Sequence, residues 1–187
     1  MPIPLPVTFA AGTAGEWRID RLERVLGDGL PRAERLARLE GPAAGTALSG
    51  AVWRLRGTTS NMRYTTGVER DRLAAKQPDL GRPAATRAAL IPVRKSAEWW
   101  ELGQDERRAI FEERSRHIGT GLDYLPAVAR RLYHCRDLGE PFDFLTWFEY
   151  AAADADAFEQ LVCKLRATEE WRYVEREVDI RVSRPGA

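Results

Sequence analysis

The chain of 187 residues is poor in several features that would point to a particular class of protein. Its only cysteines, Cys135 and Cys163, are too few for a disulfide framework and lack CxxC spacing, so we expect a reducing compartment. The net charge of +1 gives no general attraction to nucleic acid or to anionic lipid, and any anion specificity must be local. Three prolines interrupt residues 1–6, so no continuous apolar run begins the chain. We therefore expect a cytoplasmic protein without a signal or transmembrane segment.

Histidine is equally scarce, so chemistry that depends on it can be enumerated. His117 lies in a predicted helix and His134 lies at the end of a predicted strand. They form no HxxxH or HExxH pair, which disfavours a zinc site. An isolated histidine is more often a satisfied core or surface residue than a ligand, and the spacing alone leaves both readings open.

The abundant residues indicate a soluble globular protein, with 44% hydrophobic and 30% charged residues. Residues 88–184 carry the clearest periodicity. An apolar run that contains Pro92 predicts an edge strand, because proline cannot donate a ladder hydrogen bond. Apolar residues at helical spacing predict two helices. The predicted elements of this half are strand 88–94, helix 105–121, strands 127–136 and 142–150, helix 155–165 and strand 174–182.

This β-α-β-β-α-β order is that of a ferredoxin-like unit, so we expect an α+β fold whose antiparallel sheet carries its helices on one face. The first half is less regular, and residues 17–26 would suit a helix as well as a strand. We expect a shortened module of the same kind at 1–87 and a complete one at 88–187, in the manner of a dimeric α+β barrel. The predicted elements of the first half are strands 7–10, 17–26 and 52–56 and helix 67–77.

One strand carries an unusual arginine. Alternation places Val128, Arg130, Leu132 and His134 on one side of the strand 127–136, so a cation interrupts an apolar face. A snorkelling or salt-bridged guanidinium at a sheet edge would explain it structurally. The functional alternative is a fixed cation in an apolar cavity, where it holds a small anion.

Several stretches together resemble one known family. Residues 91–100 read IPVRKSAEWW, 107–117 read RRAIFEERSRH, and 125–150 read LPAVARRLYHCRDLGEPFDFLTWFEY, followed by RATEEWRYV at 166–174. This half closely resembles the chlorite dismutases, and the short, dimeric lineage in particular. The first half matches more loosely, through WRLRG at 53–57, SNMRY at 60–64 and GRP at 81–83.

The resemblance implies a haem b bound by the module 88–187, between helices and sheet. It assigns His117 as the protein ligand of the iron and Arg130, thirteen residues later, as the distal arginine. It also assigns Glu170, in the TEEW motif, as the carboxylate that accepts a hydrogen bond from the histidine ring and tunes the iron. His134 does not match the family's histidine position and is expected to be structural.

Other assignments concern the rest of the haem site. Trp99 is expected beside the haem, with Trp100 less well placed, although both would also serve as core anchors. Lys95 and Tyr64 resemble the family's polar partners of the haem propionates, while a solvated lysine is the alternative for Lys95.

The implied function is that of a chlorite dismutase, which converts chlorite into chloride and dioxygen through an oxo-ferryl haem and transient hypochlorite. The implied assembly is a homodimer. Two alternatives stay open from the sequence: a haem-binding or haem-transfer protein of this fold without chlorite turnover, and an enzyme like the coproheme decarboxylases, whose chains are usually longer and lack this arginine.

Overall fold

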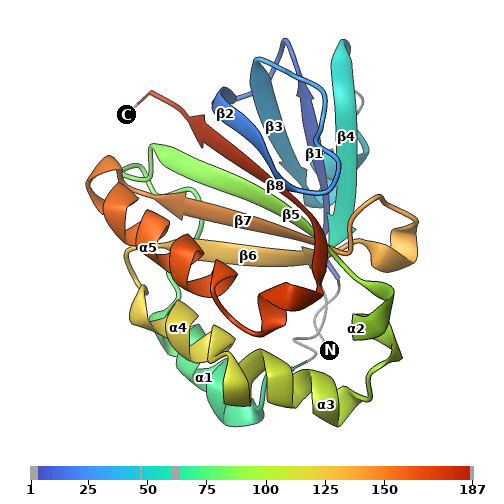
Figure 1. Ribbon diagram of the computed structural model, residues 1–187. Helices are drawn as coiled ribbons and strands as arrows, with labels where there is room; N and C mark the ends of the chain where they lie inside the picture. The colour runs from blue at the N-terminus through green and yellow to red at the C-terminus, as the bar shows by residue number, and fades with distance from the viewer. Residues whose placement is uncertain (1–3, 47, 60–63, 186–187) are drawn as a thin grey trace.

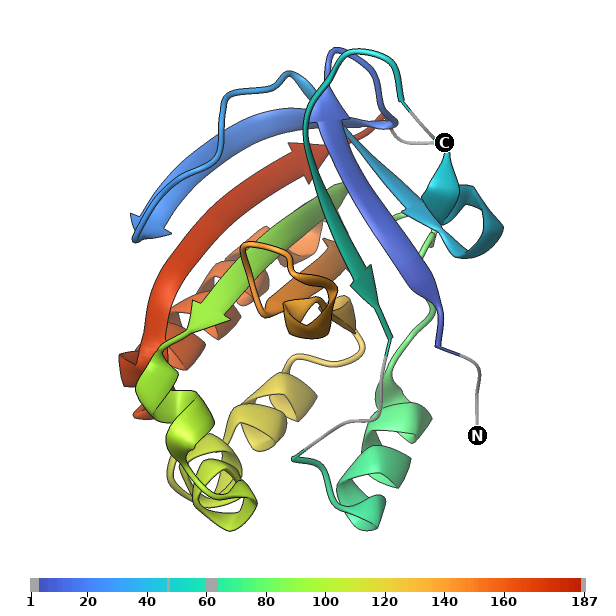
Figure 2. The same cartoon turned by 90° about the vertical axis from the view of Figure 1, so that its right-hand side faces the viewer.

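The computed structural model describes residues 4–46, 48–59 and 64–185. Within them, eight strands pair into one closed antiparallel barrel in the order β1-β3-β2-β8-β5-β7-β6-β4 (Figure 1 and Figure 2). Residues 60–63, which belong to the looser half of the resemblance, and residues 1–3 lie outside the described residues. The strands are β1 Pro6–Gly12, β2 Trp17–Leu26, β3 Arg35–Glu40, β4 Ala51–Thr58, β5 Arg87–Lys95, β6 Ala129–His134, β7 Phe144–Tyr150 and β8 Val174–Ser183.

The helices lie outside the barrel, and α4 and α5 lie below the half formed by β5–β8 (Figure 1). No helix of the described residues combines the length and apolarity that a membrane span needs. The helices are α1 Gly67–Lys76, α2 Ala97–Glu101, α3 Gln104–Arg108, the π-helix η2 Ala109–Arg114, α4 His117–Asp123 and α5 Ala155–Arg166, with short 3-10 turns η1 Gly41–Gly45, η3 Arg136–Leu138, η4 Ala152–Asp154 and η5 Glu170–Tyr173.

The closed barrel shows that the expected ferredoxin-like sheet was wrong. An open four-stranded sheet would leave two unpaired edges, and here strands of the first half cover both. β8 pairs with β2, and β6 meets β4 through Thr58 and His134. Gly57 permits this approach, because a Cβ there would lie 2.8 Å from the Cβ of Tyr133. Each half contributes four strands, and the division into modules at residue 87 stays a prediction.

The strand around Pro92 is central in the sheet. β5 pairs with β7 on one side and with β8 on the other, so the expected edge position was wrong. The proline is tolerated because the β5–β8 register lapses between Leu90 and Val93, where a missing N–H breaks no bond to β8. The apolar run has a different cause, since both faces of this strand are buried.

Two hydrophobic cores lie on opposite faces of the sheet formed by β5–β8. Inside the barrel, Trp147 packs against Phe9 and Trp17 of the first half, with ring centroids 5.6 and 5.4 Å apart. Outside it, Phe148 and Ile91 pack against the apolar face of α5. The sequence predicted α5 correctly, because its apolar stripe recurs at helical spacing and faces the sheet.

The predicted helix 105–121 is broken into three segments. α3 leads into the π-helix η2, and the chain then turns sharply at Ser115 and Arg116 before α4 begins. Arg116 has a left-handed backbone with φ of 49°, which is uncommon outside glycine. The break gives α4, the third segment, its own direction, so His117 stands at the start of a new helix.

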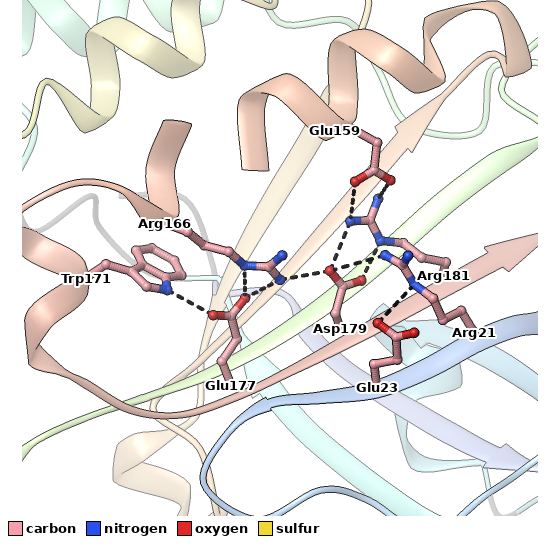
Figure 3. A network of polar contacts seen from close by, with 8 residues as sticks. All are labelled: Arg21, Glu23, Glu159, Arg166, Trp171, Glu177, Asp179 and Arg181. Atoms are coloured by element: carbon pink, nitrogen blue, oxygen red, sulfur yellow. Dashed lines mark hydrogen bonds and ion pairs between the residues drawn. The ribbon is translucent and has the colours of Figure 1, made fainter. Parts of the chain in front are cut away.

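A network of ion pairs joins α5 to the barrel (Figure 3). Asp179 on β8 accepts hydrogen bonds from Arg166 at 2.8 Å and from Arg181, and Glu177 also accepts from Arg166 at 2.8 Å. Trp171 donates its indole N–H to Glu177 at 2.9 Å. The side chains of Glu177 and Asp179 are each 1% exposed. Hydrogen bonds from these donors therefore replace the water that the two carboxylates lose on folding.

We expect Asp179→Ala to destabilise the protein by about 3 kcal/mol, because it strips two largely buried guanidinium groups of a carboxylate. Asp71→Ala is the matched control: Asp71 and its partner Arg70 are both more than half exposed, so we expect a change below about 0.5 kcal/mol. Urea unfolding measures both differences, and equal effects would contradict the structural role of the network.

The contribution of Asp179 to stability should also depend on pH. Burial acts to raise the pKa of Asp179, but the hydrogen bonds and charges of Arg181 and Arg166 outweigh it and hold that pKa below its usual value. A lowered folded-state pKa gives stability that is present above the unfolded-state value and lost as pH falls. The difference between wild type and Asp179→Ala should therefore shrink below about pH 4.

Candidate functional site

A cavity of about 470 Å³ lies against the outer face of the barrel. Ile91, Val93 and Phe148 of the sheet and Val162 and Leu165 of α5 give it apolar walls. The structure brings all the predicted site residues to this one cavity. They are Tyr64, Lys95, Trp99, His117, Arg130 and Glu170.

Three of them form a hydrogen-bonded array in the cavity wall. The Nδ1 of His117 lies 2.6 Å from Oε2 of Glu170, and the Nζ of Lys95 donates to Oε1 of Glu170 at 2.7 Å. The side chains of Glu170 and Lys95 are 4% and 3% exposed, and that of His117 is 16% exposed. Because a carboxylate only accepts, Nδ1 is the nitrogen that donates to Glu170, and Nε2 is the nitrogen that can face a ligand.

Different elements hold the three side chains in place. The N–H of Glu170, in the turn η5, donates to the hydroxyl of Ser115 at 3.0 Å. Lys95 ends β5, where its backbone N–H donates to Asp143 at 2.7 Å. Burial acts to raise the pKa of Glu170, but the charges and hydrogen bonds of His117 and Lys95 outweigh it and hold the pKa below its usual value. Glu170 is therefore a buried carboxylate anion.

The structure excludes a solvated Lys95. Its ammonium group bonds to Glu170 and lies 4.7 Å from the ring centroid of Trp99. Trp99 is fully buried, and Tyr64 contacts it edge-on with ring centroids 5.9 Å apart. The Oη of Tyr64 and the Nε1 of Trp99 have no hydrogen-bond partner among the described residues. Two buried polar atoms of the cavity wall thus lack partners within this part of the chain.

Arg130 enters the cavity from β6. It is half-buried, and among the described residues it forms no ion pair with a carboxylate. Loss of solvation lowers the pKa of its guanidinium, while the charge of Glu112 acts in the opposite direction. Gln77, which follows α1, donates its side-chain amide N–H to the Arg130 carbonyl at 2.6 Å. The alternative of an edge salt bridge therefore does not describe this side chain.

Some contacts of the site gave no signal in the sequence. The ring of Phe111 stacks on His117 with centroids 4.3 Å apart, and Ser115 binds the backbone of Glu170. Both belong to the segment predicted as one continuous helix, and the break before α4 brings them against His117 and Glu170. His134 also lines the cavity, beside Phe144. Trp100 lies further out, where its indole N–H donates to Asp143 at 3.2 Å.

Comparisons with known proteins agree on one family. Residues 36–185 match the sequence model described as chlorite dismutase. The chlorite dismutase of Ideonella dechloratans is 36% identical over 107 residues, which make up 52% of this chain and 35% of that relative. The matched region thus spans about a third of the length of this curated relative.

Solved structures extend the similarity over nearly the whole chain. A crystal structure of dimeric chlorite dismutases from Nitrobacter winogradskyi is 56% identical, covers 96% of this chain and 99% of that chain, and superposes with a TM-score of 0.88. Chlorite dismutase from Candidatus Nitrospira defluvii in complex with imidazole is 22% identical, with 97% and 91% of the two chains covered and a TM-score of 0.69, and this shows the shared fold alone. On the family model and the close structural relative, the chain belongs to the chlorite dismutase family.

Proposed function

We propose that this protein is a haem b-dependent chlorite dismutase, which converts chlorite into chloride and dioxygen. The observation that carries the proposal is the buried array of His117, Glu170 and Lys95 in the wall of the cavity that also receives Arg130. Membership of the chlorite dismutase family supports it independently.

The residues of the cavity fit a haem. His117 has one ring nitrogen bound to a carboxylate and the other available as a ligand, the arrangement that metal-binding histidines favour. The apolar walls suit a porphyrin face, and the unpartnered Tyr64 Oη and Trp99 Nε1 are polar atoms of the kind that a bound group can satisfy. His117 would hold the iron, with Trp99 packed beside the porphyrin and Tyr64 toward its propionates. Lys95 would act through Glu170 more than on a propionate, because its ammonium is already bound there.

When bound, haem would supply the redox-active iron at which chlorite is cleaved. The protein's part is to set the basicity of the His117 ring. Glu170 accepts a hydrogen bond from the Nδ1–H group, which gives the ring partial anionic character and makes Nε2 a stronger donor. Lys95 keeps Glu170 ionised and in place, since a single buried carboxylate without a cation would be unfavourable.

Arg130 would be the residue that binds the anionic substrate. Its guanidinium is a permanent cation in a poorly solvated cavity, where charge-assisted hydrogen bonds to an oxyanion are stronger than in water. It would attract chlorite into the cavity and keep the hypochlorite that chlorite cleavage gives from escaping. Confinement matters because hypochlorite that escapes would oxidise the protein and give no dioxygen.

We propose a homodimer, supported by the relative from Nitrobacter winogradskyi whose structure is described as dimeric. We also propose a cytoplasmic location, supported by two free cysteines, Cys135 and Cys163. Two cysteines that form no disulfide are typical of a protein in a reducing compartment.

The first test is dioxygen evolution from chlorite by the haem-loaded protein, recorded with an oxygen electrode beside the haem absorption spectrum. His117→Ala should lose most haem affinity and activity, because no other ring nitrogen in the array can bind iron. His134→Ala is the matched control and should keep the haem spectrum. A normal five-coordinate histidine spectrum in His117→Ala would refute the ligand assignment.

The role of Glu170 is tested by Glu170→Gln. A neutral amide is a weaker acceptor than a carboxylate, so the ring becomes a poorer donor, the iron reduction potential rises, and activity falls by about 10- to 100-fold. The neighbouring Glu169, which pairs with Arg114 at the surface, provides the control Glu169→Gln. An unchanged potential with haem fully bound would count against the tuning role.

Arg130→Ala separates confinement from stability. The variant should still bind haem and react with chlorite, but it should release more hypochlorite into solution and inactivate sooner. A chlorination reporter measures the released oxidant, and the exposed Arg54 gives the control Arg54→Ala. Equal release from wild type and Arg130→Ala would remove the confinement role.

A further inference from the structure

The helix that carries His117 begins without a cap from its own N-cap residue. Arg116 precedes α4 in a left-handed conformation and offers no side-chain hydrogen bond to the helix. The first N–H groups of any helix have no partner within it, and a start without a cap is unfavourable. The first intrahelical bond runs from Thr120 N–H to the Arg116 carbonyl, so residues 117–119 need other acceptors.

Glu112 supplies two of these acceptors from the preceding π-helix. Its Oε2 accepts the N–H of Ile118 at 2.6 Å, and its Oε1 accepts the N–H of Gly119 at 3.1 Å. A carboxylate here also complements the positive end of the helix dipole.

The same segment also holds the ring of His117. Phe111, next to Glu112 in sequence, stacks on the imidazole at an interplanar angle of 21°. The wide π-helical turn places both side chains toward the start of α4. Such π segments often occur at functional sites. Phe111 thus contacts the His117 ring, and Glu112 contacts the backbone of the first turn of α4.

We propose that Glu112 is a positioning residue, which fixes the orientation of His117 by capping the helix that carries it. This inference rests on the proposed function for its consequence at the iron. The cap would set the angle at which Nε2 of His117 meets its ligand, while Glu170 sets its basicity. Two carboxylates would then act on one histidine, one through the backbone and one through the ring.

The test compares Glu112→Ala and Glu112→Gln with the control Glu113→Ala, whose side chain lies one residue further along and is exposed. Amide hydrogen exchange of the peptide 116–123, measured on the purified protein, should be about fivefold faster in Glu112→Ala, the factor that loss of one capping side chain gives. Glu112→Gln keeps one acceptor oxygen and should lie between. Glu113→Ala should match the wild type.

The second readout is the ferric EPR spectrum of the haem-loaded variants, which reports the geometry at the iron. Glu112→Ala should change its rhombic splitting while haem stays bound, and Glu112→Gln should show a smaller change. Wild-type exchange and EPR in both variants would overturn the proposal, as would faster exchange with an unchanged spectrum.

Amide exchange does not depend on chlorite turnover, so the test separates the two claims. A wild-type protein that fails to evolve dioxygen would refute the proposed function and leave the capping result standing. If Glu112→Ala does not fold, Glu112→Gln carries the same comparison with the wild type and with Glu113→Ala.

Discussion

The buried carboxylate of Glu170 requires two donors, and this requirement brings the parts of the site together. An ionised carboxylate at 4% exposure is stable only where cations and N–H groups replace water. Its two donors come from the end of β5 and from the start of α4, through Lys95 and His117, while the backbone N–H of Glu170 donates to Ser115 in the segment before α4. A strand, a helix and a turn that are distant in sequence must therefore meet at one point, and that point is the wall of the cavity.

The inner and outer faces of the barrel have different roles: the inner face packs the core, and the outer face carries α5 and the cavity. The interior is filled by aromatic and aliphatic side chains from both halves of the chain, and this packing stabilises the strands. The outer face of β5–β8 is only partly covered by α5, and the remaining apolar surface becomes the cavity. The network around Asp179 and Glu177 keeps α5 at its place beside that opening (Figure 3).

The sequence predicted what depends on local pattern, and it missed what depends on distant pairing. The stripe of α5 and the alternation of β6, which turns Arg130 outward, follow from periods of 3.6 and 2 residues. Barrel closure depends on strand pairs between distant residues, such as Thr58 with His134, which a local sequence pattern does not predict. The strand β3 was missed for the same reason. Family resemblance, more than spacing, predicted Lys95 beside the propionates and Glu170 beside His117, and the contact between Lys95 and Glu170 emerged only from the structure.

The arginines show why the anion binding proposed for this protein would be a local property. With a net charge of +1 the chain has no broad positive field to collect small anions. Arg166 and Arg181 are also removed from water, yet carboxylates neutralise both of them. Arg130 differs, because among the described residues no carboxylate pairs with it and Glu112 acts on it only through its charge. A cation that has lost solvation without gaining a protein partner interacts most strongly with an anion that enters the cavity, so selectivity for a small oxyanion can rest on this single side chain.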